Sequence, residues 1–141
     1  MSWSKEEVHA FLAEETRIGR LATASAAGQP HVVPIWFRVV GDDLQIHTMA
    51  ESTKARNVAA NGRFAITIDK DSLPYKGVTL TGPAEVVGNE AVDSISLIRE
   101  LAVRYVGPDA GPGFGDHVAS MQGEHVTLVL HIESWEAWDY S

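Results

Sequence analysis

Three β-prone runs decide the fold: IGRLATAS at 18–25, HVVPIWFRVV at 31–40 and LQIHT at 44–48. β-Branched and aromatic residues dominate these runs and short polar turns separate them, so they predict a three-stranded β-meander. Pro34 has no N–H to donate to a neighbouring strand, which indicates a bulge or a sheet edge at that point. In an alternating strand only one of Trp36 and Phe37 faces the core, so the other is available to a ligand or a partner.

Apolar periodicity predicts three helices, over 5–15, 52–61 and 90–105. Ser4 and Glu7 form a capping box ahead of the first helix. Ser52 is a good N-cap for the second helix, and Gly62 is the residue type that ends one. After the third helix, four glycines and two prolines predict a loop over 106–115.

Three further strands are predicted: RFAITID at 63–69, KGVTLTGPAEVV at 76–87 and VTLVLHI at 126–132, the last running on toward Trp135 and Trp138. Gly82 and Pro83 indicate a bulge or a sharp bend, as a barrel corner requires. Short strands with regularly spaced turns are typical of a small closed barrel. The sequence shows no repeat or linker, so residues 1–141 are predicted to form one domain.

Composition excludes several classes of protein. The net charge is −8, and residues 85–141 hold ten acidic and only two basic side chains, which argues against general binding to nucleic acid or anionic membranes. Cysteine is absent, which excludes disulfides, thiolate metal sites and thiol catalysis. There is no apolar run long enough for a membrane span and no signal-peptide pattern at 1–11, so a cytoplasmic protein is expected.

The segment STKARN at 52–57 carries the best local chemistry. Hydroxyl groups, free backbone N–H groups and the cations Lys54 and Arg56 meet there at the positive end of a helix, as a phosphate site requires. The alternative is a capped surface helix with ordinary cations. Cations near a helix N-terminus oppose the helix dipole, which favours a bound anion.

Other catalytic patterns are missing. The sequence has no GxGxxG or GxxxxGK[ST] loop and no GxSxG elbow. His31 and His47 lie on neighbouring predicted strands, where they could face each other, and His125 and His131 flank the last strand. No histidine spacing predicts a metal site.

Five segments together match a known family: IGRLAT at 18–23, GQPHVVPIWF at 28–37, STKARN at 52–57, LTGPAEV at 80–86 and IESWEAW at 132–138. In this order they resemble the flavin/deazaflavin oxidoreductase branch (F-420-dependent, B-type) of the pyridoxamine-phosphate-oxidase-like split barrels. The resemblance implies a mainly β (α+β), six-stranded, Greek-key-like FMN-binding split β-barrel with flanking short helices. It also implies a homodimer with two cofactor sites at the subunit interface. The apolar excess of VVPIWF and VTLVLHI agrees with a second copy.

The resemblance further implies a set of cofactor-binding residues. The phosphate clamp would comprise Ser52, Thr53, Lys54 and Arg56. The strand against the planar ring would contribute Val33, Pro34, Ile35 and Trp36. The pyrimidine edge would meet His47 and Thr48, and an acidic tail could meet Lys76. Loop 106–115, Trp135 and Trp138 are candidates to cover the partner's site, whereas no catalytic residue and no metal ligand is implied.

The compact chain and its short clamp look more like the members that use coenzyme F-420, with FMN as the alternative. The function implied is hydride transfer from reduced F-420 to an unsaturated small organic acceptor. Two further hypotheses remain: a flavin- or tetrapyrrole-binding module without turnover, and a structural barrel with no ligand.

Overall fold

The computed structural model describes residues 2–141. Its helices are α1 (Lys5–Glu14), α2 (Thr53–Asn61), α3 (Ser94–Val106) and α4 (Gly111–Ala119). Its strands are β1 (Gly19–Ala24), β2 (Pro30–Ile35), β3 (Arg38–Val40), β4 (Asp43–Met49), β5 (Arg63–Lys70), β6 (Lys76–Val87), β7 (His125–His131) and β8 (Ser134–Asp139). All paired strands are antiparallel, in the order β2-β1-β5-β6-β7-β4-β3, and β8 pairs with β6.

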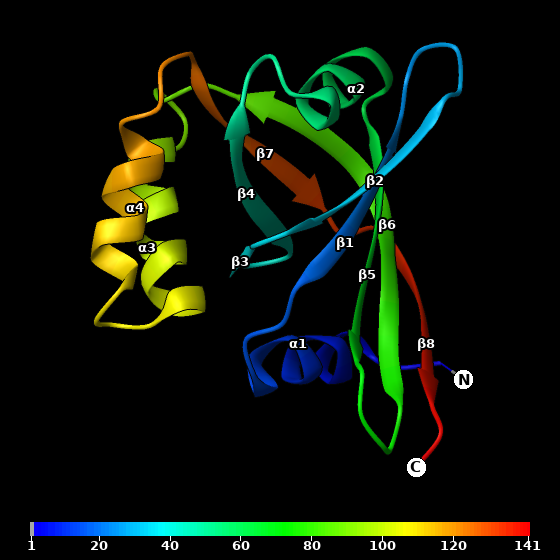
Figure 1. Cartoon of the computed structure of the whole chain (residues 1–141). Helices are drawn as coiled ribbons and strands as arrows, with labels where there is room; N and C mark the ends of the chain where they lie inside the picture. Colours follow the sequence, from blue (N-terminus) through cyan, green and yellow to red (C-terminus); the bar gives the residue numbers. More distant parts are fainter. Residues whose placement is uncertain (1) are drawn as a thin grey trace.

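Strand β6 joins the two halves of the sheet because it changes partner along its length. Residues 76–83 pair with β5 and residues 76–81 also pair with β8, whereas residues 84–87 pair with β7. Gly82 lies at the change, where a Cβ atom would overlap the carbonyl oxygen of His131. The bend predicted there is confirmed, and the sheet curls into a half-barrel flanked by four helices (Figure 1).

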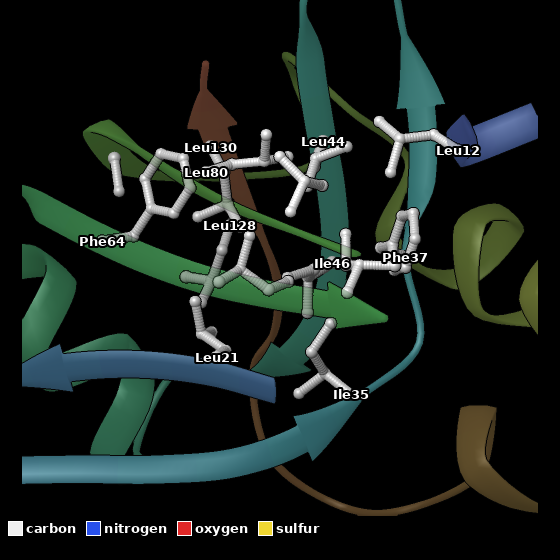
Figure 2. Close-up of a cluster of buried hydrophobic side chains, with 14 of the residues drawn as sticks. Leu12, Leu21, Ile35, Phe37, Leu44, Ile46, Phe64, Leu80, Leu128 and Leu130 are labelled. Atoms are coloured by element: carbon white, nitrogen blue, oxygen red, sulfur yellow. The ribbon is translucent and has the colours of Figure 1, made fainter. Parts of the chain in front are cut away.

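The core fills the inside of this half-barrel. Leu21, Leu44, Leu80 and Leu128 come from four different strands, and their side chains are fully buried together (Figure 2). Helix α1 begins with the predicted capping box at Ser4 and contributes further buried side chains to the same cluster. Each fully buried leucine contributes about 1.5–3 kcal/mol through removal of its surface from water.

The segment predicted as one strand over 31–40 is instead two strands. Strand β2 ends at Ile35, and β3 begins at Arg38. Between them, Phe37 enters the core and its N–H donates to the hydroxyl of Tyr105 at 3.2 Å, whereas Trp36 stays outside the core. Strand β2 is a sheet edge, in agreement with Pro34. With β8 as a separate strand, the structure has eight strands where the sequence predicted six.

The loop predicted over 106–115 is wrong for its second half, which belongs to α4. Helix α4 packs directly on α3, and Figure 1 shows the pair lying side by side. A Cβ at Gly111 would come within 2.6 Å of the Cα of Val103, and one at Gly115 within 3.2 Å of Ala102. These glycines therefore permit close helix packing. The third predicted helix also begins later than expected, after the N-cap Asp93.

We expect Gly82→Ala to lower the free energy of unfolding by about 1–3 kcal/mol, because the new methyl group meets fixed backbone at the bend of β6. Urea denaturation measures the change. Gly113→Ala is the matched control, since a Cβ at that helical position meets nothing within 4 Å and alanine is the better helix former. Equal stability of the two variants would contradict the close approach described above.

Candidate functional site

A cleft of about 470 Å³ opens between the end of β2, the start of α2 and the α3–α4 pair. Small-molecule sites typically measure ~300–1,000 Å³. Five residues predicted from the sequence line it: Pro34, Ile35, Trp36, His47 and Lys54. Among the lining residues only His47 and Lys54 titrate, so the cleft has apolar walls and a single polar edge.

Trp36 forms a fixed aromatic wall. Its ring stacks on Tyr105 of α3 with a centroid distance of 5.1 Å and an interplanar angle of 9°, and it contacts Phe114 of α4 at 5.5 Å. The Tyr105 hydroxyl donates to the carbonyl oxygen of Arg17 at 2.8 Å. Burial raises the pKa of Tyr105, so its hydroxyl stays protonated.

The start of α2 is tied to two strands by side-chain hydrogen bonds. Ser52 Oγ accepts from the Ala55 N–H at 3.2 Å and lies 2.9 Å from Thr48 Oγ1 at the end of β4. One turn later, the buried Asn57 donates to Thr23 Oγ1 of β1 at 3.1 Å. The predicted caps at Ser52 and Gly62 are confirmed. This end of the helix is therefore held in a fixed position beside the cleft.

Lys54 has no carboxylate partner among residues 2–141, although the chain is acidic. Seven of the eleven Lys and Arg side chains lie within 4 Å of a carboxylate, but Lys54 and Arg56 do not. No acidic residue occupies the first turn of α2. Burial partly desolvates the charge of Lys54 and therefore lowers its pKa. Lys54 also lies in the first turn of α2, at the positive end of the helix dipole. An anion in the cleft, such as a phosphate group, would offset both the desolvation of Lys54 and its repulsion by the helix dipole.

His47 points its ring at His125 of β7 rather than at His31. The Nε2 atom of His47 lies 2.8 Å from Nδ1 of His125, and His125 Nε2 lies 2.8 Å from the carbonyl oxygen of Met121. The predicted approach of His31 and His47 is wrong, because β2 and β4 are not neighbours in the sheet. Burial, His125 and Lys54 together lower the pKa of His47 from 6.5 to about 4.

The other predicted site residues lie outside the cleft lining. Thr48 and Ser52 support the start of α2 from behind, and Val33 packs against the core. Thr53 and Arg56 are exposed on α2. Lys76, the first residue of β6, is not among the residues that line the cleft. It contacts Glu14 at 3.4 Å, so one chain does not bring it to the cleft.

Sequence reasoning missed the helical side of the cleft. The residues concerned are Ile98 and Leu101 of α3 and Phe114 and Val118 of α4. The spacing of Gly111 and Gly115, four residues apart, was the available signal for α4, since small residues on one helix face permit close packing. His125 had no signal, because 78 residues separate it from His47.

Within residues 2–141, no group of three or more histidine and carboxylate side chains is placed to hold a metal ion. No helix in the described part of the chain is both long and apolar enough to cross a membrane.

The unfolding free energy should rise with pH more steeply in the wild type than in His47→Gln between about pH 4 and 6.5. The pKa of His47 is lowered in the folded state, so the unfolded chain binds more protons in this window and is favoured by acid. Above this window the two curves should run parallel. Urea denaturation across the range tests this, and curves that stay parallel throughout would contradict the lowered pKa.

Known proteins resemble this chain over much of its length. An alignment over 77 residues is 35% identical to the 5a,11a-dehydrotetracycline/5a,11a-dehydrooxytetracycline reductase of Streptomyces rimosus. It covers 49% of this chain and about half (54%) of that enzyme. A solved conserved hypothetical protein of Mycobacterium tuberculosis is similar at a TM-score of 0.76 with 27% identity, over 99% of this chain and 87% of that one. An F420 reductase structure gives 0.73 with 25% identity, over 90% and 94%. The family model for pyridoxamine 5'-phosphate oxidase matches residues 4–139, and the chain therefore belongs to this split-barrel family.

Proposed function

We propose that this protein is an oxidoreductase that passes a hydride from reduced coenzyme F-420 to an unsaturated organic acceptor. The observation that carries the proposal is the apolar cleft with one partly desolvated, unpartnered cation, Lys54, at the start of a helix. The distant similarity to a dehydrotetracycline reductase and to an F420 reductase supports the same class of chemistry.

The residues of the cleft fit a planar, phosphate-bearing cofactor. Lys54 and the free first-turn N–H groups of α2 would hold a phosphate, and the exposed Arg56 would meet further negative charge. Trp36 and Ile35 offer an apolar surface to a flat ring. When bound, F-420 supplies the hydride. The apolar side chains of α3 and α4 would exclude water from the reacting atoms.

FMN is the second candidate cofactor, and the small number of unpartnered cations near the cleft favours it. F-420 has an acidic tail, yet beyond Lys54 and Arg56 the unpartnered cations of the described chain are only Lys70 and Arg104, neither of which lines the cleft. A flavin- or tetrapyrrole-binding module without turnover would share the same cleft. Reduction of an added enone or quinone by the bound cofactor distinguishes the enzyme from such a module.

We also propose that the protein is a homodimer. The supporting observation is Val32, which is 68% exposed on the edge strand β2. The apolar run of β7 gives no such support, because α3 and the core bury it within one chain. A partner subunit at β2 would lie next to the open side of the cleft and complete it.

Lys54→Ala should weaken F-420 binding by ~10- to 100-fold, the value of one charged hydrogen bond. Titration of the purified protein with F-420 and with FMN, followed by fluorescence, measures the affinities. Lys70→Ala is the matched control, because Lys70 also lacks a carboxylate partner but lies outside the cleft. Binding of neither cofactor at micromolar concentration would refute the proposed function.

Gel filtration with light scattering should give twice the mass of one chain at micromolar concentration. Val32→Lys should shift the protein toward the monomer, because a charge replaces the exposed apolar side chain on the edge strand. Asp71→Lys, which changes an exposed charge outside β2 and the C-terminal strand, should leave the mass unchanged. A monomeric wild type at these concentrations would rule the dimer out.

A further inference from the structure

Reduction of a carbon–carbon double bond requires a proton as well as a hydride. A hydride adds to one carbon, and the other carbon or its conjugated carbonyl takes up negative charge that a proton must neutralise. The walls of this cleft are apolar, and only His47 and Lys54 among the lining residues can carry a proton. The candidates for a proton donor are therefore two.

Of these two, Lys54 is assigned to the anion of the cofactor. Tyr105, which lies behind Trp36, is excluded by its hydrogen bonds, because its hydroxyl donates to the carbonyl oxygen of Arg17 and accepts from the N–H of Phe37. His47 is the remaining group. It comes from β4 and faces His125 of β7 and Lys54 of α2, while the cleft residues from β2, α3 and α4 are uncharged.

The hydrogen bonds of the histidine pair fix where its proton can enter and leave. The Met121 carbonyl can only accept, so His125 Nε2 carries a hydrogen. In the neutral pair His125 Nδ1 must then accept, and His47 Nε2 must donate to it. Of the four ring nitrogens of the pair, only His47 Nδ1 has no hydrogen-bond partner within residues 2–141. A proton added to the pair therefore places a hydrogen on His47 Nδ1, whichever ring carries the charge.

We propose that His47 is the general acid of the reduction and that His125 is its positioning residue, an inference that rests on the proposed function. The hydride would come from a C–H bond of reduced F-420, which is thereby oxidised by two electrons. It forms a C–H bond at one carbon of the acceptor's polarised C=C bond, and the π electrons move onto the conjugated carbonyl. The His47 Nδ1–H bond then breaks, and the proton forms the second C–H bond with that electron pair. The histidine pair is left neutral and takes its next proton from solvent.

An anion beside Lys54 prepares the pair for this role. In the free protein burial, His125 and Lys54 together hold the pKa of His47 down, so His47 is neutral near pH 7. A phosphate bound to Lys54 offsets the charge of that lysine and attracts an imidazolium. Cofactor binding therefore raises the pKa of His47, and the protein takes up protons as F-420 binds.

The experiment combines binding, spectroscopy and kinetics on the full chain. Calorimetric titration with F-420 in two buffers of different ionisation enthalpy should show proton uptake near pH 6, and His47→Gln should abolish this uptake at F-420 concentrations that saturate the variant. Nitrogen-15 NMR of the wild type at pH 7 should show His47 with its hydrogen on Nε2. With an enone acceptor, His47→Gln should lower kcat by ~100-fold or more, the usual value of a general acid.

Two further variants separate a chemical role from a structural one. His125→Ala removes one of the groups that lower the pKa of His47, so the basic limb of the pH–rate profile should move to higher pH. His131→Gln is the matched control, since His131 contacts Asp43 outside the cleft and should leave uptake and rate unchanged. Wild-type turnover in His47→Gln, or a neutral His47 with its hydrogen on Nδ1, would overturn this inference alone. Failure of the wild type to bind F-420 would overturn the proposed function and the inference together.

Discussion

The close approach of Gly82 to the carbonyl oxygen of His131 is the constraint on which the half-barrel depends. It lets β6 leave β5 and β8 and continue against β7, so one strand serves both halves of the sheet. Strand β7 then pairs with all of β4, and this register sets His125 diagonally across from His47 on one face. The end of β4 leads directly into the cap of α2. A backbone contact far from the cleft thus positions the polar edge of the cleft.

The charges of the chain are arranged so that this edge stays positive. The protein carries a net charge of −8, yet its carboxylates are used elsewhere: Asp93 caps α3, Asp116 pairs with Arg99, and Asp43 contacts His131. Lys54 and Arg56, in contrast, have no carboxylate within 4 Å among residues 2–141. Because exposed charges are screened within ~8–10 Å in physiological salt, the distant acids weaken this local field only slightly. A small anion can be attracted to one place on a protein that repels polyanions.

Features that depend on neighbouring residues were accessible from the sequence. The capping box at Ser4, the start of α2 at Ser52 and the bend at Gly82 each follow from a local conformational rule, and all three are present. Helix α4 was missed, because glycine and proline normally break helices and here the glycines permit packing against α3. The contact between His47 and His125 depends on strand register across 78 residues, which no local pattern encodes.

A cleft with apolar walls favours hydride transfer but hinders proton supply, and the histidine pair is suited to meet both requirements. Apolar walls strengthen electrostatic interactions and protect a hydride donor, but they also remove the water that would supply a proton. A permanently charged acid in the same walls would carry a desolvation cost whenever the cleft is empty. Burial and Lys54 keep His47 neutral in that state, and an anion reverses part of this effect. The positive charge of His47 would then appear only when a ligand is present to stabilise it. The phosphate that anchors the cofactor would therefore also cause His47 to take up its proton.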